Sequence, residues 1–212
     1  MRPAIALFAR APIPGRVKTR LVGRLSAEQA ADLYRAFVRD MWETLGALGS
    51  QAELFLYTDW EHPEWRTLAG ENTKLQKGAD LGERMLDCFE QMGAAGFGPL
   101  LILGSDSPAL PASTIAPFTN LLAGSPSVIG PAEDGGYYAI GCRAPHPRMF
   151  EGVEWSSPRT LTQTVAALAR CGMAPAYLPQ HYDVDTPEDL ARLASEPHLG
   201  RHTRQWLEQN WR

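Results

Sequence analysis

Short apolar runs alternate with amphipathic segments along this chain, and the alternation predicts strands and helices in turn. Apolar runs typical of buried strands cover residues 4–9, 52–59, 99–106, 127–131 and 136–141. Helical spacing predicts helices at about 27–49, 80–93, 114–123 and 157–172, with another after Thr186 and a last one at 201–211. Two short pieces near 176–179 and 181–185 are expected to be extended. Strand–helix alternation builds a largely parallel sheet with helices on both faces, so the predicted fold class is α/β.

The predicted helices begin with capping sequences. Ser26 precedes Gln29 by three residues, and Asp80 precedes Glu83 by the same spacing, as in capping boxes. Thr186 is followed by Pro187 at the first helical position, and Asp189 on that helix is expected to help cap it. These signals place the helix starts from local chemistry alone.

The chain has 212 residues and no internal repeat or linker composition, so we expect a single domain over 1–212. Residues 197–212 form a C-terminal helical tail in this prediction. Its aromatic and apolar residues, Trp206, Leu207 and Trp211, suggest packing on a partner and therefore a homo-oligomer. The three cysteines are far apart, and the first apolar run is short for a secretory signal. Together they favour a cytoplasmic protein.

Charge is unevenly distributed along the chain. The net charge is −4, yet residues 1–39 hold eight Lys/Arg and only two Asp/Glu. A local basic site in an acidic chain suits a small anionic ligand better than a nucleic acid. No stretch has the length of a membrane span, so we expect no membrane partner. A solvated basic surface is the plainer interpretation of the same cluster.

Carboxylates stand at the ends of predicted strands. Asp106 follows the most apolar strand, where an unpaired charge would be costly to bury. Asp183 and Asp185 lie two apart, so an extended chain points both the same way. We assign Asp106 and Asp185 as ligands of Mg²⁺ or Mn²⁺, which prefer oxygen donors, and give Asp183 a structural role in capping the next helix. Helix capping is the alternative for Asp106 and Asp185 as well.

The loop after the first strand, LFARAPIPGRVKTRL, is rich in cations. Gly15 permits close approach of a phosphate, and Arg10, Lys18 and Arg20 supply positive charge. The spacing matches neither a Walker A loop nor GxGxxG. With carboxylates at other strand ends, the loop predicts a polyphosphate site in which a metal and cations neutralise the ligand from both sides.

Three further segments are candidate pocket walls. Asp80, Gly82 and Arg84 either line a nucleotide pocket or simply begin a helix. Gly135 and Gly136, beside Asp134, either let a substrate approach the backbone or form a hairpin turn. Trp155, with Ser156 and Ser157, is a weaker candidate for an acceptor site.

Five motifs together resemble a bacterial family of glycosyltransferase-like proteins of unknown function. They are LFARAPIPGRVKTRL, DLGERM, GSDSPAL, GPAEDGGYYAIG and DVDTPEDL, in the same order over about residues 5–190. This family is often labelled the arsenosugar-biosynthesis glycosyltransferase type, within the nucleotide-diphospho-sugar transferase (GT-A) superfamily. The resemblance implies a three-layer α/β/α sandwich with a mixed, mainly parallel sheet.

The resemblance also implies site roles. Asp106 corresponds to the metal-binding aspartate after the central strand, Asp185 to the second acidic position, and Arg10, Lys18 and Arg20 to the basic first loop. One departure is chemical: sugar-transferring members usually carry an Asp-x-Asp pair, whereas this chain has Ser105-Asp106-Ser107. Nucleotidyltransferase relatives also use a single Asp at this position.

Three functions remain open from the sequence. The first is metal-dependent glycosyl transfer from a nucleotide-diphospho-sugar to a small-molecule acceptor, with Asp134 as a candidate base. The second is nucleotidyl transfer, in which a phosphorylated substrate attacks a nucleoside triphosphate and Lys18 and Arg20 steady its phosphates. The third is a non-catalytic nucleotide-binding domain.

Overall fold

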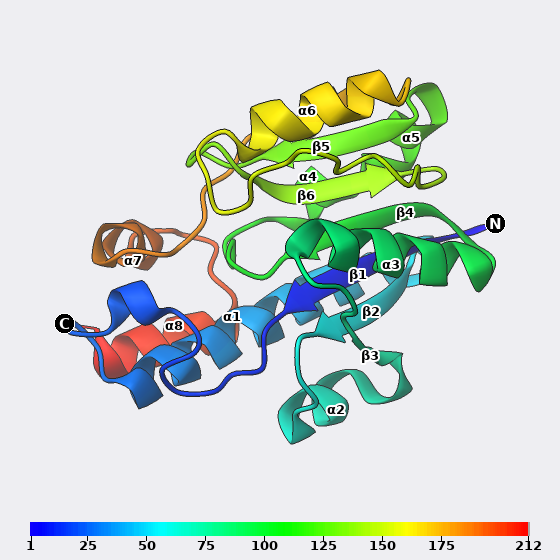
Figure 1. Cartoon of the computed structure of the whole chain (residues 1–212). Helices are drawn as coiled ribbons and strands as arrows, with labels where there is room; N and C mark the ends of the chain where they lie inside the picture. The colour runs from blue at the N-terminus through cyan, green and yellow to red at the C-terminus, as the bar shows by residue number, and fades with distance from the viewer. Residues whose placement is uncertain (212) are drawn as a thin grey trace.

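Seven strands form one mixed sheet between two layers of helices in the computed structural model, which describes residues 1–211 (Figure 1). The sheet order is β3-β2-β1-β4-β6-β5-β7, and within the described residues β6 alone runs against the other strands. The strands are β1 (Arg2–Ala9), β2 (Glu53–Thr58), β3 (Thr73–Leu75), β4 (Phe97–Gly104), β5 (Ser127–Pro131), β6 (Tyr137–Cys142) and β7 (Pro175–Tyr177). The prediction of a mixed, mainly parallel sheet is confirmed.

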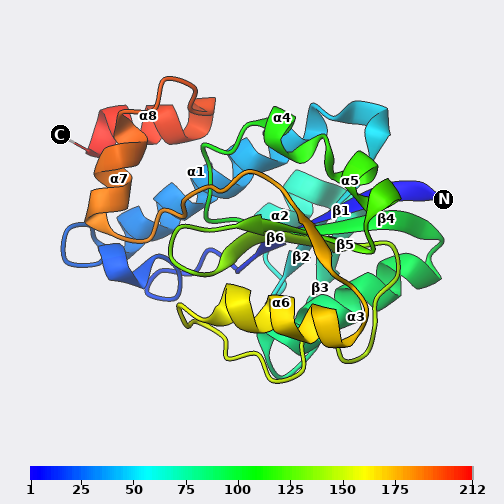
Figure 2. The ribbon, with the colours of Figure 1, turned by 90° about the horizontal axis from the view of Figure 1, so that it is seen from above.

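Helices cover both faces of the sheet, as Figure 2 shows. One face carries α1 (Ala27–Gly46), α2 (Pro63–Ala69), α4 (Ala112–Ile115) and α5 (Phe118–Gly124), which share one apolar core with the sheet. The other face carries α3 (Leu81–Ala94) and α6 (Thr160–Arg170), which share a second core. Both faces of the central strands are therefore buried, which explains their continuous apolar runs. The three-layer α/β/α sandwich is confirmed.

The predicted helix starts are confirmed by their hydrogen bonds. Ser26 and Gln29 form a reciprocal capping box at α1, and Thr186 and Asp189 form another at α7 (Pro187–Ala194). Asp80 accepts a hydrogen bond from the backbone N–H of Glu83 at the start of α3. Each cap satisfies backbone donors that the first turn of a helix leaves without partners.

The C-terminal helix α8 (Arg201–Asn210) lies against α1. Trp206 and Leu207 are buried in a third core, with residues of α1 and α7. The expectation that these two side chains pack on a partner is therefore wrong, because the chain itself covers them. The helix at 201–211 is confirmed to within one residue.

Some boundaries differ from the sequence-based expectation. The helix predicted at 114–123 is two short helices, α4 and α5, separated around Pro117, whose ring and missing N–H interrupt a helix. The helix predicted from residue 157 begins at Thr160, and β4 ends at Gly104, so Asp106 lies beyond the strand. The extended piece at 181–185 makes only one isolated bridge, between His181 and Ala132. Neither α2 nor β3 was expected, because both are short.

None of the helices within residues 1–211 combines the length and the apolar character needed to cross a membrane.

Candidate functional site

Three chain segments meet at the carboxyl ends of β1 and β4, which are neighbours in the sheet. The first loop leaves β1, Asp106 follows β4, and the segment 183–185 runs beside it. The backbone N–H of Val184 donates to the carbonyl of Asp106 over 2.8 Å, which fixes the position of this segment. The topology therefore brings together the basic loop and both predicted metal ligands.

Lys18 joins the three segments. Its Nζ donates to Asp106 Oδ1, to the carbonyl of Val184 at 2.7 Å and to Asp185 Oδ1 at 3.1 Å. Arg20 adds a longer ion pair to Asp185 Oδ2 at 3.4 Å. The Lys18 side chain is 3% exposed, whereas those of Asp106 and Asp185 are 44% and 40% exposed. The ammonium is thus enclosed, while both carboxylates keep a face toward solvent.

Burial works to lower the pKa of the Lys18 ammonium, but the charges and hydrogen bonds of Asp106 and Asp185 outweigh it and raise that pKa. Lys18 is therefore a permanent cation at neutral pH. Its backbone has φ of +47°, an uncommon value for a residue with a side chain. Such strain persists only where the surrounding structure imposes it, and three acceptors on one ammonium supply that constraint.

The base of the first loop is held by buried hydrogen bonds. Tyr34 of α1 accepts from the Arg10 N–H over 2.8 Å and shares a hydrogen bond of 2.7 Å with Ser105. The N–H of Ala11 donates to Asp59 over 2.7 Å, and Trp65 Nε1 donates to the Arg10 carbonyl over 2.9 Å. The loop is therefore fixed from α1, from α2 and from Asp59, directly after β2, before any ligand binds.

Asp183 is a buried carboxyl group beside the same centre. Ser107 Oγ donates to its Oδ1 over 2.5 Å, and burial, followed by the charge of Asp106, raises its pKa to about 7. The predicted capping role of Asp183 is wrong, because Thr186 and Asp189 provide the cap of α7 themselves. Its side chain instead ties the 183–185 segment to the residue after Asp106.

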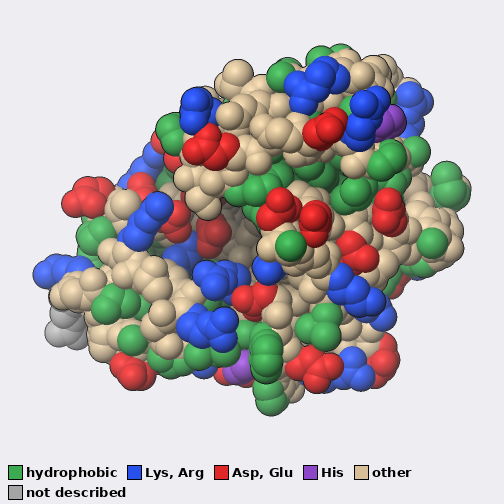
Figure 3. Space-filling view, viewed as in Figure 1, with side chains coloured by type: hydrophobic (Ala, Val, Ile, Leu, Met, Phe, Trp, Pro, Cys, Tyr) green, Lys and Arg blue, Asp and Glu red, His purple; other side chains and the backbone are tan. Residues whose placement is uncertain are grey.

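The three segments border a cleft with two parts, visible as a hollow with charged side chains around it in Figure 3. The basic cavity, of about 510 Å³, is lined by five cationic side chains. These are Arg10, Arg16, Lys18, Arg20 and Arg84. The acidic cavity, of about 440 Å³, extends past Asp134 to Trp155 and Ser157. Both cavities share Arg20, Asp106, Asp183 and Asp185 in their walls, so they are parts of one cleft.

The residues predicted for the nucleotide pocket separate into two groups. Arg10, Lys18, Arg20 and Arg84 line the basic cavity. Gly15, with φ of +76°, lies outside both cavities at an exposed turn of the loop. Asp80 caps α3, and Gly82 is buried where an added Cβ would lie 2.7 Å from the Trp155 ring. For Asp80 and Gly82 the structure therefore shows a cap and a packing role.

The turn between β5 and β6 borders the acidic cavity. Asp134 is exposed in its wall and accepts a hydrogen bond from the Gly136 N–H over 2.8 Å. Gly136 also lines this cavity. Gly135 packs beneath the next wall segment, since a Cβ there would lie 2.2 Å from the Pro158 carbonyl oxygen. Its φ of +90° adds a second reason for glycine.

Sequence reasoning missed several side chains of the cleft. Gln76 and Tyr137 line the basic cavity, as does Tyr34. Gln76 follows β3, a strand too short to be recognised, and Tyr34 lies in the middle of a helix. Tyr137 begins β6 within the quoted glycine-rich motif, so its position beside that motif was the available signal.

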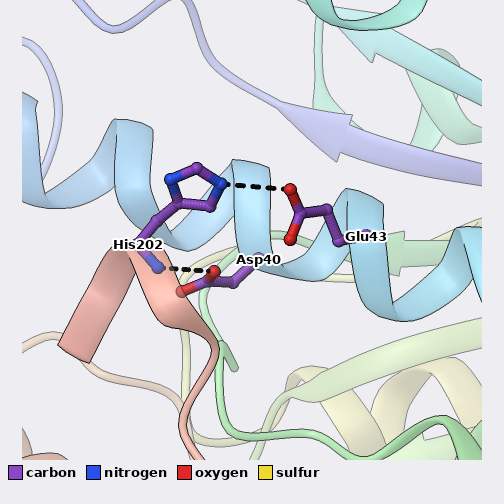
Figure 4. A group of neighbouring side chains, drawn as sticks. All are labelled: Asp40, Glu43 and His202. Carbon is purple, nitrogen blue, oxygen red and sulfur yellow. Dashed lines mark hydrogen bonds and ion pairs between the residues drawn. The ribbon is translucent and has the colours of Figure 1, made fainter. Parts of the chain in front are cut away.

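A second group of titratable side chains joins α1 to α8 (Figure 4). Asp40 accepts from the N–H groups of His202 and Thr203, over 3.0 and 2.7 Å, and thereby caps α8 from another helix. Glu43 Oε1 accepts from Arg201 over 2.6 Å and lies 3.1 Å from His202 Nε2. Three such groups are a conceivable metal set, but these contacts already account for them as a helix-docking cluster.

Comparisons with known proteins agree with this architecture. Residues 41–157 match the family described as uncharacterized protein conserved in bacteria (DUF2064). The chain is 32% identical to a protein from Desulfovibrio desulfuricans G20 that is provisionally assigned as a nucleotide-diphospho-sugar transferase. The two structures superpose with a TM-score of 0.89, covering 99% of this chain and 95% of the other. No curated protein matches the sequence.

More distant structures share the fold alone. A cytidylyltransferase from Leptospira borgpetersenii is 16% identical, with a TM-score of 0.59 over 99% of this chain and 93% of that one. A nucleotidyl transferase from Methanothermobacter is 15% identical, with a TM-score of 0.59 over 99% of this chain and 100% of that one. By sequence and fold together, the chain belongs to the DUF2064 family, within the nucleotide-diphospho-sugar transferase superfamily.

Proposed function

We propose that this protein is a nucleotide-dependent transferase that moves a glycosyl group from a nucleotide-diphospho-sugar to a small-molecule acceptor. The observation that carries the proposal is the meeting of Lys18, Asp106 and Asp185 beside a cavity lined by arginines. The proposal is supported by the similar protein from Desulfovibrio desulfuricans G20, which is provisionally assigned as a nucleotide-diphospho-sugar transferase. The arsenosugar-specific type stays a prediction.

The basic cavity suits the diphosphate of such a donor. Guanidinium groups match phosphate oxygens in pairs, and Arg10 and Arg20 are mostly exposed, with side chains 60% and 71% accessible. Arg16 and Arg84 lie in the same wall. Lys18 adds a fixed positive charge at the boundary with the acidic cavity. The donor would therefore lie over the first loop, with its transferable group toward the shared carboxylates.

The residues present fit a divalent cation. Asp106 and Asp185 each direct one oxygen at the Lys18 ammonium and are partly exposed, and hard oxygen donors are what Mg²⁺ and Mn²⁺ prefer. Lys18 holds these two carboxylates close together, so both are available to one ion beside it. When bound there, such an ion supplies Lewis-acid stabilisation of the leaving diphosphate.

The transfer step needs a hydroxyl group and a base. The acceptor oxygen bonds to the anomeric carbon while the bond from that carbon to the β-phosphate oxygen breaks, and the nucleoside diphosphate leaves. The acceptor proton passes to a carboxylate, for which Asp134 in the wall of the acidic cavity is our candidate. Arg20 and Lys18 then hold the negative charge that develops on the leaving group.

Nucleotidyl transfer is the second candidate. One observation favours it: a single carboxylate, Asp106, follows β4, flanked by Ser105 and Ser107 instead of a second acid. The five cations of the basic cavity would also suit a triphosphate. A nucleotide-binding domain without catalysis is the remaining alternative.

Thermal-shift measurements with Mg²⁺ or Mn²⁺ distinguish these functions. Stabilisation by sugar nucleotides, and not by nucleoside triphosphates, is the expected result. Stabilisation by triphosphates alone would favour nucleotidyl transfer, and stabilisation by either class, with no product formed in a separate assay of nucleotide turnover, would favour the non-catalytic domain. No shift with any nucleotide would reject the proposal.

The variant Asp106→Ala tests the assigned centre. We expect it to lose the metal-dependent part of the nucleotide shift, because half of the proposed ligand pair is removed. Asp32→Ala, an exposed carboxylate on α1, is the matched control and should keep the full shift. An unchanged shift in Asp106→Ala would reject the metal role of this residue.

A further inference from the structure

The two parts of the cleft differ in charge. Five cations and three carboxylates line the basic cavity, whereas one cation and four carboxylates line the acidic cavity, counted over the described residues. The carboxylates of the acidic cavity are Asp106, Asp134, Asp183 and Asp185. Lys18 and Arg20 already pair with Asp106 and Asp185, whereas no ion pair within the described residues involves Asp134. A phosphorylated molecule would therefore meet the negative charge of Asp134, whereas a hydroxyl group can donate hydrogen bonds to its oxygens. The acidic cavity is therefore suited to an uncharged ligand rich in hydroxyl groups.

An aromatic and hydroxyl-bearing segment, residues 155–160, forms the far wall of this cavity. Trp155, Ser156, Ser157 and Thr160 all line it. An indole offers apolar surface to the C–H groups of a sugar ring, while hydroxyls and carboxylates orient the ring's hydroxyl groups. Trp155 packs edge-on against Phe150, with ring centroids 5.9 Å apart, so its position is fixed by the protein.

Two glycines fix the wall segment in place. Gly82 lies under Trp155, and Gly135 lies under Pro158, each so close that a Cβ would overlap the neighbour. Thr160 Oγ1 closes the segment on itself by donating to the carbonyls of Glu154 and Ser157, over 2.9 and 2.7 Å. The glycines of the DLGERM and GPAEDGGYYAIG motifs thus provide the space in which the wall segment packs.

Ser156 carries backbone strain in this wall. Among residues 1–211, Lys18 and Ser156 are the two non-glycine residues with positive φ, at +47° and +57°. Both line the basic cavity, and Ser156 also lines the acidic one, where the two join. Strain of this kind concentrates at functional sites, because precise placement of a group there is worth its energetic cost.

We propose that the acidic cavity is the acceptor subsite and takes a neutral, polyhydroxylated molecule, with Trp155 and Ser156 contacting it and Asp134 selecting against phosphorylated compounds. The inference rests on the proposed glycosyl transfer and names its acceptor class. It also separates the two candidate reactions, since nucleotidyl transfer to a phosphorylated substrate requires a phosphate in this cavity.

Saturation-transfer difference NMR measures the preference directly. The probes are glucose, galactose and mannose, each paired with its 1-phosphate, added to the full chain with excess pyrophosphate so that the phosphate-binding basic cavity is already occupied. Wild-type protein should give several-fold more saturation transfer to at least one neutral sugar than to its phosphate. Ser156→Gly, which keeps the positive φ and removes the hydroxyl, should reduce that signal.

Asp134→Lys should reverse the preference: saturation transfer to the neutral sugar should fall, and saturation transfer to the sugar phosphate should rise. Glu90→Lys, an exposed carboxylate on α3 outside the cleft, carries the same charge change and should leave both signals at the wild-type level. Asp134→Asn removes the charge with little change of shape and should weaken discrimination without adding attraction.

Three results would overturn the inference: equal or stronger binding of the phosphates by wild-type protein, no saturation transfer to any neutral sugar, or neutral-sugar signals unaffected by Ser156→Gly and Asp134→Lys. Thermal shifts with nucleotides keep the two proposals distinguishable. If sugar nucleotides stabilise the protein but sugar phosphates bind better than neutral sugars, the proposed function stands and the proposed acceptor class is rejected. If neutral sugars bind better than their phosphates but sugar nucleotides do not stabilise the protein, the acceptor subsite stands and the proposed nucleotide-sugar donor is rejected.

Discussion

Lys18 shows how one side chain can organise a site. Its ammonium is the shared partner of Asp106 and Asp185, which come from two segments far apart in the sequence. Removing the ammonium leaves the two negatively charged carboxylates close together with only Arg20, among the described residues, to offset their repulsion. Because both carboxylates are about two-fifths exposed, water screens part of the resulting repulsion.

We expect Lys18→Met to lower the free energy of unfolding by about 1–3 kcal/mol, the usual cost of losing hydrogen bonds to charged groups. Urea denaturation at neutral pH measures this change. Arg16→Met, an exposed cation of the same loop, is the control and should change stability by less than about 0.5 kcal/mol. Equal stabilities for the two variants would contradict the organising role of Lys18.

Gly135 allows a second prediction at the residue scale. Gly96 has nearly the same φ, +86° against +90°, but open space around its Cβ position. Gly135→Ala and Gly96→Ala therefore share the conformational cost of about 1 kcal/mol, and differ in the overlap with Pro158. We expect Gly135→Ala to be the more destabilising by a further 1–3 kcal/mol, roughly the cost of overpacking. Urea denaturation measures the free energies of unfolding of both variants. Similar values for the two would show that the wall segment moves aside at little cost.

At the scale of elements, α8 is attached to α1 by charge as well as by apolar contact. Burial works to raise the pKa of Glu43, but hydrogen bonds and charges from His202 and Arg201 lower it overall. A lowered pKa means that the contact stabilises the fold above the unfolded-state pKa of Glu, about 4.3, and that this contribution disappears as pH falls through the folded-state value.

Glu43→Gln should therefore be less stable than wild type at pH 6, by a small amount because the pair is largely solvated. The difference should vanish near pH 3. Urea denaturation of both proteins across this range tests the sign. A difference that grows toward low pH would show that Glu43 does not act through its charge.

Elements were predictable where their signals were local and long. The caps at Ser26, Asp80 and Thr186 correctly gave helix starts because each needs only residues within one turn. The helix predicted at 114–123 is interrupted at Pro117, which is itself a local signal in the sequence. By contrast, β3 has three residues and owes its existence to pairing with β2, so no local pattern reveals it.

At the scale of the whole molecule, the basic cavity is a local exception in an acidic protein. The first 39 residues carry +6 and the remainder −10, yet the tertiary structure brings carboxylates of the acidic remainder to Lys18 and Arg20. Attraction of a phosphate ligand is therefore local, and it should be screened by salt beyond about 10 Å.

We expect the affinity for the nucleotide that stabilises the protein best to fall as NaCl is raised from about 50 to 300 mM, because exposed guanidinium groups bind the phosphates. Arg16→Gln should weaken binding at low salt and flatten this dependence. Arg66→Gln, an exposed arginine on α2, should do neither. Titration calorimetry at several salt concentrations measures this dependence. An affinity that does not change with salt would argue against a phosphate-binding role for the basic cavity.

Local sequence established the α/β class, most helix starts and that a carboxylate follows β4, because hydrophobic period and capping chemistry act between near neighbours. Long-range packing placed Lys18 between Asp106 and Asp185, the latter 167 positions from Lys18, and turned Asp183 toward Ser107. It also decided that Gly82 and Gly135 support the wall at Trp155 and Pro158. The physical reason is that these contacts depend on strand order and on where long connections return to the sheet, and both follow from the free energy of the whole packed chain.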